Sequence, residues 1–416
     1  MFFSRSVRLF QFGGIGIIGS LATGCSFGLS EEAFLACTRL YDGDVSLEGF
    51  KKQNEALYSE LSDAGFFDDV EAVSSIKSCY LHITQACNMN CVGCYSWSRS
   101  RNVSKDLSTS EVFHVLDGLR NMSIERIVVS GGEPFLRDDL PQILRYARES
   151  CSIDKIEVIT NGTLLSREAV RSVKDFVDCI ALSIDRASSK YPSLIRKGPP
   201  FEKLVDCVTL IRQEGIKAHL IATIHSENYE QYNEFINLAC FLGASLNFSL
   251  LSCPVDGDCG SFCPDDSVLK KIADSAFTSN SMFSTKGKSY SDFFQNEIKG
   301  KCAAGAKVAS VGHDGNVYPC HMLHVSDMCA GNILKDSLEE IALNLHSFSS
   351  RCSCVDDIAK CRDCDYRYYC GGGCRARSLL DGGNLDSPDS YCAMNMRFYE
   401  LCEHKAIDEL TFRKFA

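Results

Sequence analysis

Short apolar segments alternate with amphipathic helices between residues 78 and 255, and this alternation restricts the fold more than any other feature of the chain. The expected strands are CYLHIT, RIVVS, KIEVIT, CIALSI, AHLIATI and LNFSLL. We expect helices to begin near Thr109, Asp138, Ser166, Phe201 and Asn228. Strands that alternate with helices form a parallel sheet covered by helices. Because these units are too few to close an eight-unit barrel, the sequence predicts an α/β fold with a partial (β/α)6 barrel.

Three polar motifs follow the first three expected strands, each at the point where its strand ends. C-x3-C-x2-C at residues 87–94 follows the first strand, SGGEP at 130–134 follows the second, and NGT at 161–163 follows the third. The carboxyl ends of parallel strands meet at one edge of a sheet, where α/β proteins carry out their chemistry. We therefore expect the three motifs to form one site.

Cysteines this close together in one loop are typical of a metal site, because thiolates bind both zinc and iron–sulfur clusters. A closed tetrahedral site needs a fourth ligand. Cys79 is expected at the opposite end of the first strand and His82 within it, so neither lies near the loop. An open coordination position is typical of a catalytic metal, and at this point zinc remains an alternative to an iron–sulfur cluster.

A C-x3-C-x2-C motif after the first strand of a six-unit partial barrel resembles the signature of the radical S-adenosylmethionine (SAM) enzymes. The resemblance implies a [4Fe–4S] cluster with one iron left free for SAM, held by Cys87, Cys91 and Cys94. In that family an electron from the cluster cleaves SAM to methionine and a 5′-deoxyadenosyl radical, which abstracts a hydrogen atom. Gly93 departs from the aromatic residue that many members carry before the third cysteine.

The same resemblance implies further contacts to SAM. SGGEP is similar to the family's second motif, whose backbone and acidic residue hold the methionyl ammonium group, and the carboxylate of Glu133 suits that cation on electrostatic grounds. The residues implied to contact SAM are Gly131, Gly132, Glu133, Asn161, Ser183 and Asp185.

From about residue 300 the alternation stops and the density of cysteines rises. Their spacing resembles, in every interval, the seven-cysteine pattern of the SPASM extension, which is found on radical SAM enzymes that modify peptides and proteins. The resemblance implies two auxiliary [4Fe–4S] clusters, and so three clusters in all. The ligands implied for the first are Cys302, Cys320 and Cys374, and for the second Cys361, Cys364, Cys370 and Cys392.

The first auxiliary set has only three cysteines, and the sequence leaves its fourth position open. The position could be free to bind a substrate thiolate, or it could be filled by Cys253, Cys259, Cys263, Cys329, Cys352 or Cys354. By spacing alone, C-x2-C-x5-C-x3-C at residues 361–374 would also suit a zinc knuckle.

Residues 1–72 precede the barrel and combine short β segments with helices. SVRLFQF, GIGIIGS and ATGCSFGLS are the expected strands, followed by a helix capped by Ser30 and a second helix from about Ser46 to Gly65. This is the outline of a winged helix-turn-helix, and it resembles the element with which peptide maturases bind the leader of a precursor. A plain structural cap is an alternative. DNA binding is disfavoured because five basic residues stand against about a dozen acidic ones.

Compartment and partners follow from cysteine usage and charge. Arg5, Arg8 and Cys25 imitate an export signal, but Gln11 and several glycines interrupt its apolar core. No other stretch is apolar for long enough to span a bilayer, so we expect no membrane partner. The chain has 24 cysteines, and such a high content predicts a protein of the reducing cytoplasm in which thiols bind metal. The net charge of −11 offers no basic surface for nucleic acid, which is not an expected partner.

The sequence therefore predicts a winged-helix-like domain (1–72), a radical SAM barrel (78–255), a linker (256–300) and a SPASM domain (301–416). We expect a peptide maturase that crosslinks a ribosomally made peptide, with an electron donor such as flavodoxin or ferredoxin. A sulfatase maturase that generates formylglycine is an alternative, although such enzymes carry Asp where this chain has His321. An iron–sulfur or zinc DNA-binding regulator is a second alternative. No catalytic acid or base is assigned, and His321 and His324 are only candidates.

Overall fold

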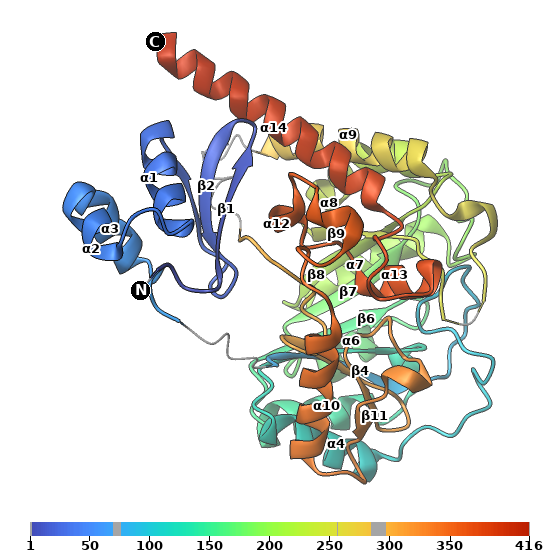
Figure 1. Ribbon diagram of the computed structural model, residues 1–416. Coiled ribbons are helices and arrows are strands. Elements are labelled where there is room, and N and C mark those ends of the chain that lie inside the picture. Colours follow the sequence, from blue (N-terminus) through green and yellow to red (C-terminus); the bar gives the residue numbers. More distant parts are fainter. Residues whose placement is uncertain (1, 70–75, 256, 284–296, 416) are drawn as a thin grey trace.

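A parallel sheet forms the centre of the computed structural model, which describes residues 2–69, 76–255, 257–283 and 297–415 (Figure 1). The strand order is β12-β11-β10-β4-β5-β6-β7-β8-β9, and β4 to β9 run parallel to one another. Their bounds are β4 Ser78–Thr84, β5 Arg126–Gly131, β6 Lys155–Thr160, β7 Cys179–Ile184, β8 Lys217–Ile224 and β9 Ser245–Leu250. The expected partial barrel is confirmed, with each strand within one residue of its expected bounds.

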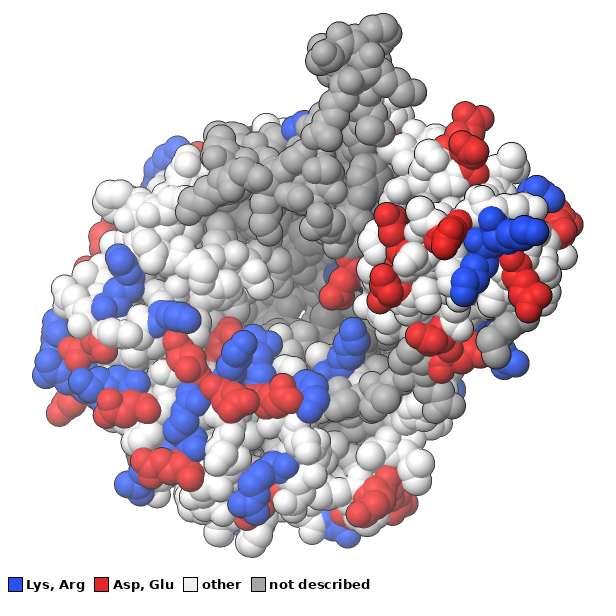
Figure 2. All heavy atoms as spheres, turned by 90° about the vertical axis from the view of Figure 1, so that its left-hand side faces the viewer, with Lys and Arg blue, Asp and Glu red and all other residues white. Residues whose placement is uncertain are grey.

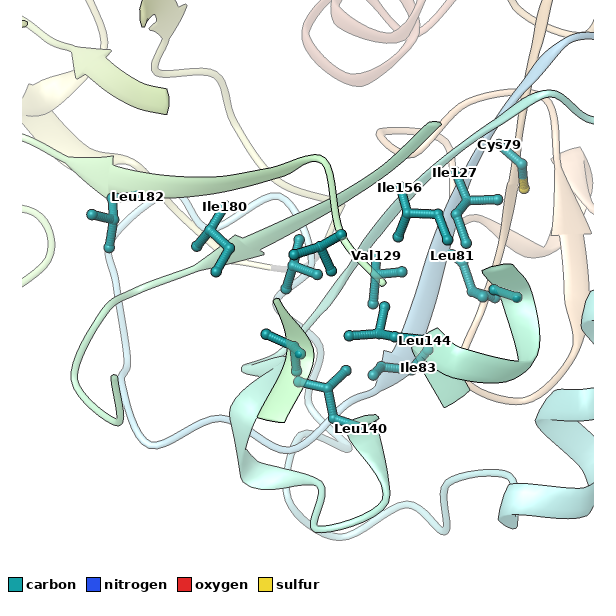
Figure 3. Close-up of a cluster of buried hydrophobic side chains, with 14 of the residues drawn as sticks. Cys79, Leu81, Ile83, Ile127, Val129, Leu140, Leu144, Ile156, Ile180 and Leu182 are labelled. Atoms are coloured by element: carbon teal, nitrogen blue, oxygen red, sulfur yellow. The ribbon is translucent and has the colours of Figure 1, made fainter. Parts of the chain in front are cut away.

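Helices follow the barrel strands and cover the sheet. They are α4 Thr109–Asn121, α5 Leu140–Arg145, α6 Arg167–Val173, α7 Phe201–Gln213 and α8 Tyr232–Leu242. Ser108 and Glu111 form a capping box that fixes the start of α4, and Gly243 ends α8 in the left-handed conformation. The core lies between sheet and helices. Figure 3 shows part of it, where side chains of β4, β5 and β6 lie near Leu140 and Leu144 of α5.

The cysteine-rich segment extends the same sheet, which the sequence did not indicate. β10 Val308–Val311 pairs parallel with β4, and the antiparallel strands β11 Asn316–Tyr318 and β12 Gly331–Asn332 follow it. Strands this short carry no measurable periodicity. The helices of this cysteine-rich segment are α10 Leu338–Arg351, α11 Ala359–Arg362, α12 Arg367–Cys370, α13 Arg375–Gly382 and α14 Cys392–Phe415.

The stretch expected as a linker contains a helix of its own, α9 Asp266–Phe283. It packs along α14, and Arg397 of α14 forms a 2.7 Å ion pair with Asp274 of α9 (Figure 1). Residues 257–283 are therefore joined to the SPASM segment by direct packing. Within the described ranges, no helix has the length and hydropathy needed to cross a membrane.

The N-terminal unit is a small antiparallel sheet with three helices. Its elements are β1 Val7–Phe12, β2 Ile15–Ser20, β3 Ser26–Leu29, α1 Glu31–Tyr41, α2 Leu47–Gln53 and α3 Glu55–Asp63. The stretch that imitates an export signal forms β1 and β2. One expected helix is divided in two at Asn54, whose backbone is not helical.

Both faces of the small sheet are covered. One face packs against α1–α3 through Val7, Ile18 and Phe50. The other packs against the SPASM segment, where the ring of Phe12 lies 5.1 Å from that of Tyr369. Arg8 adds a 2.9 Å ion pair to Asp356. The unit is thus docked on the cysteine-rich segment rather than on the barrel (Figure 1).

Replacing Phe12 should loosen this docking. Phe12 is fully buried, and removing such a ring costs about 3–5 kcal/mol. We expect Phe12→Ala to lower the thermal midpoint and to expose residues 1–69 to limited proteolysis. Phe241→Ala is the matched control, because Phe241 is 84% exposed and its loss should cost less than about 0.5 kcal/mol. Equal protease resistance of the two variants would contradict the docked arrangement.

Candidate active site

A cavity of about 420 Å³ opens at the carboxyl ends of the barrel strands. The three motifs expected to form one site all contribute to its wall, and β7, β9 and the SPASM segment complete it. The expected site residues that line it are Cys87, Cys91, Cys94, Gly131, Gly132, Glu133, Asn161 and Ser183.

The cysteine loop is joined to the glycine turn after β5 by backbone hydrogen bonds. Gly132 N–H donates to the carbonyl of Thr84, and Glu133 N–H donates to the carbonyl of Ala86, each at 2.8 Å. A Cβ at position 132 would lie 1.9 Å from the carbonyl oxygen of Ala86, and one at 131 would lie 2.2 Å from that of Thr84. Gly131 also has a φ of +128°. Only glycine allows this approach, so both glycines position the cysteine loop.

Glu133 is buried beneath this turn and ties it to β6. Its carboxylate accepts hydrogen bonds from the Thr160 hydroxyl at 2.7 Å and from the Asn161 N–H at 2.8 Å. Burial raises its pKa above the ordinary value, although these hydrogen bonds act against that shift. Among the described residues Glu133 forms no salt bridge. A buried carboxylate in a cavity wall without a cationic partner suits the ammonium group of SAM.

Three arginines that the sequence analysis missed line the same cavity, namely Arg101, Arg196 and Arg377, of which Arg377 is paired with Asp389. Arg101 donates to Cys94 Sγ at 3.3 Å and to Ser96 at 3.1 Å. Burial alone would raise the pKa of Cys94, but the charge and hydrogen bond of Arg101 bring it below the ordinary value, whereas burial raises that of Cys91 to about 11.

Part of the guanidinium group of Arg101 and of Arg196 remains available for an anionic group. Nε and Nη1 of Arg101 and Nε of Arg196 are buried without a hydrogen-bond partner among the described residues. Buried donors of this kind fit an anionic ligand such as cluster sulfide or a carboxylate. Isolated arginines in loops give no periodic signal, so the sequence could not single them out.

Asn161 and Asp185, both expected to contact SAM, form hydrogen bonds with other residues of the protein. The amide of Asn161 donates to Asn88 of the cysteine loop at 2.9 Å. Asp185 lies beside the main cavity, and its carboxylate accepts from Ser193 at 2.8 Å and from the backbone of residues 195 and 196. Because the carbonyl of Ile195 in turn accepts from Val92 N–H at 2.8 Å, Asp185 supports the cysteine loop indirectly. A contact between Asp185 and SAM stays a prediction.

The two candidate histidines lie in different places. His321 lines the cavity, stacks on Tyr80 at 4.2 Å, and has its pKa lowered to about 4 by burial. His324 is not part of the cavity wall. It hydrogen-bonds to Ser310 at 2.8 Å and stacks on Tyr318. Of the two, only His321 faces the place where a substrate would react.

The cysteines expected to hold the second auxiliary cluster surround a separate cavity of about 370 Å³. All four line it, namely Cys361, Cys364, Cys370 and Cys392. The three of the first auxiliary set, Cys302, Cys320 and Cys374, pack together in an apolar cluster. Cys352 is buried in that same cluster, and burial and the nearby thiol of Cys302 raise its pKa to about 11.

The other cysteines considered as a fourth ligand lie elsewhere. Cys253, Cys259 and Cys263 gather with one another. Cys329 is exposed, and Cys354 belongs to the cluster that holds the N-terminal sheet. Cys79 and His82 are buried within β4, as expected.

Two segments of the chain match known protein families. Residues 81–239 match the Radical SAM superfamily, and residues 302–365 match SPASM, an iron–sulfur cluster-binding domain. The chain is therefore a radical SAM enzyme with a SPASM domain, and it uses SAM and iron–sulfur clusters.

Curated relatives have more than one named activity. The AdoMet-dependent heme synthase of Methanosarcina barkeri (strain Fusaro / DSM 804) is 26% identical over 334 residues, which cover 74% of this chain and 94% of the relative. The mycofactocin maturase MftC of Mycolicibacterium smegmatis is 26% identical over 325 residues, 74% of this chain and 81% of the relative.

Solved structures share the fold. anSMEcpe with bound AdoMet has a TM-score of 0.67 at 18% identity and covers 80% of this chain and 94% of its own. Streptococcus suis SuiB bound to precursor peptide SuiA has a TM-score of 0.58 at 16% identity and covers 94% of this chain and 99% of its own. Because the match to SuiB covers 94% of this chain, it must include part of residues 2–69.

Removing the charge of Glu133 should weaken the binding of SAM. Glu133→Gln keeps the size of the side chain but replaces a charge-assisted hydrogen bond by a neutral one, so we expect the KM for SAM to rise about tenfold or more. Release of 5′-deoxyadenosine under dithionite measures this, with iron content unchanged. Glu125→Gln, an exposed change outside the cavity, is the control. A normal KM in Glu133→Gln would contradict the assignment.

Proposed function

We propose that the chain is a cytoplasmic peptide maturase that installs a thioether or carbon–carbon crosslink in a ribosomally made precursor. The observation that carries this proposal is the N-terminal unit, which is docked on the SPASM segment and lies within the fold likeness to SuiB, a protein solved with a precursor peptide. A cytoplasmic location is supported by the cysteines, none of which is paired in a disulfide.

The edge of β3 is the surface we assign to the leader of the precursor. Within the described ranges β3 pairs only with β2, so its outer edge is free to accept an added strand. Phe27 on β3 is 40% exposed and Leu35 on α1 is 62% exposed, which offers apolar contact beside that edge. Acidic residues outnumber basic ones in this unit. Figure 2 shows the face of the molecule on which it lies, where Asp and Glu side chains are interspersed with Lys and Arg. The occupant is therefore an extended, basic leader.

The cavity at the barrel rim is the place of reaction. Reductive cleavage of SAM there supplies a 5′-deoxyadenosyl radical, and flavodoxin or ferredoxin is the electron donor we propose. Cys87, Cys91 and Cys94 hold the cluster, Gly131 and Gly132 fix its loop, and Glu133 holds the ammonium group of SAM. Arg101 and Arg196 would bind anionic groups in the cavity, such as cluster sulfide or a carboxylate. The SPASM cysteines would hold auxiliary clusters, which would supply an acceptor for the electron released when the substrate radical is oxidised.

We further propose that Cys352 completes the first auxiliary set with Cys302, Cys320 and Cys374. Its burial among them in one apolar cluster supports this assignment. A set of four thiolates closes that cluster and makes electron transfer, rather than substrate binding, its role.

Crosslinking is tested with synthetic copies of any short peptides encoded beside the gene for this chain. With SAM and dithionite, we expect one peptide to lose the mass of two hydrogen atoms per crosslink, one taken by the radical and one leaving as a proton and an electron. Formylglycine formation would favour the sulfatase-type alternative, and conversion of an iron porphyrin instead would place the chain with the heme synthase relative.

A variant at Phe27 tests the proposed leader-binding surface. Phe27→Lys should repel a basic leader and lower the affinity of the modified peptide about tenfold, measured by fluorescence polarisation with a labelled copy. Leu343→Lys places the same change at a 69% exposed position on α10, away from the N-terminal unit, and should leave binding unchanged. Equal affinities of the two variants would contradict the assignment of β3.

Cys352→Ala should open the first auxiliary cluster. We expect one of the EPR signals of the reduced enzyme to change and about four irons of about twelve to become labile to chelator. Cys151→Ala, which removes a buried thiol from the barrel core, is the control. An unaltered spectrum with unaltered iron would exclude Cys352 as the fourth ligand.

A further inference from the structure

Three cysteines outside the radical SAM and SPASM patterns gather at the edge of the active-site cavity. Cys253, Cys259 and Cys263 follow β9, and their sulfur atoms lie within 4.8 Å of one another. In the described part of the chain, this is the only group of three or more His, Cys, Asp or Glu ligand atoms that come so close. Neither the radical SAM reaction nor the auxiliary clusters assigned above use these thiols.

The spacing of the sulfur atoms suits a single tetrahedral ion. Zinc binds thiolate at about 2.3 Å, which places two sulfur atoms of a tetrahedron about 3.8 Å apart. Sγ of Cys253 and Sγ of Cys263 are 3.7 Å apart. A four-iron cluster would hold thiolates farther apart, because iron and sulfide lie between them. Consistent with this, the cysteines of the other three sets do not form so tight a group among the described residues.

The packing around the group links it to the radical SAM loop. Cys259 is fully buried and packs with Leu251, Ile195 and Val92. A Cβ at position 93 would lie 2.9 Å from Sγ of Cys259 and 2.4 Å from the side chain of Leu251. Gly93 therefore leaves the space that Cys259 and Leu251 occupy, which gives a physical reason for its departure from the aromatic residue common at that position.

We propose that Cys253, Cys259 and Cys263 bind a zinc ion that fixes the conformation of the segment after β9, which packs against the loop of Cys87, Cys91 and Cys94. No fourth His, Cys, Asp or Glu ligand atom joins the group within the described ranges. Because Cys253 lines the cavity, the fourth position is left to water or to a donor inside the cavity.

Metal analysis of the full chain tests this site. The chain is expressed with both iron and zinc in the medium, purified without oxygen, and assayed for both metals. We expect about one zinc per chain besides the iron, and its loss in Cys259→Ser and in Cys253→Ser with the iron content unchanged. Cys151→Ser is the matched control for loss of a buried thiol and should keep its zinc. Cobalt added to zinc-stripped chain should give the absorption bands of tetrahedral cobalt thiolate.

Two results would overturn the proposal. One is a chain without zinc and without cobalt–thiolate bands. The other is a loss of about four irons in Cys253→Ser, because the partly buried Cys253 can be replaced with little effect on folding, and its loss would then have removed a cluster. The metal count does not depend on peptide modification, so failure here is distinguishable from failure of the proposed function.

Discussion

The close contact between the cysteine loop and the turn after β5 determines the geometry of the active site. Two backbone hydrogen bonds, from residues 132 and 133 to the carbonyls of Thr84 and Ala86, hold two loops that a single methyl group on either glycine would force apart. The same turn places Glu133 under the cavity, where Thr160 and Asn161 hold its carboxylate. Hydrogen bonds thus join the cysteine loop, the glycine turn after β5 and the end of β6, which pre-organises the residues at this rim of the barrel.

The barrel could be predicted from the sequence because its short, largely apolar strands alternate with amphipathic helices, and the first three strands each end in a distinct polar motif. β10 to β12 could not, since a strand of four residues has no periodicity and its partner, β4, lies more than two hundred residues earlier in the chain. Asn54 divides a helix for which the apolar pattern predicted no break. In the site, motif spacing identified the cysteines and Glu133. It could not identify Arg101 and Arg196, which belong to no recognisable motif, or show that Asp185 holds residues 193–196.

The SPASM segment connects the other two parts of the molecule. Through β10 it continues the barrel sheet, and through Tyr368, Tyr369 and Phe398 it covers the N-terminal sheet. A peptide held at β3 would therefore start beside the segment that carries the auxiliary clusters and reach the cavity at the barrel rim. This arrangement is consistent with all three units acting on one peptide substrate, and it does not favour a separate regulatory role for the N-terminal unit.

The central claim is that Cys87, Cys91 and Cys94 hold a cluster with one iron open to SAM. Iron, acid-labile sulfide and EPR spectra of the reduced chain, recorded with and without SAM, test it most directly. We expect about twelve irons per chain and an EPR signal that shifts when SAM is added. Replacing any one of these three cysteines should abolish that signal. Absence of sulfide, or a spectrum indifferent to SAM, would contradict it.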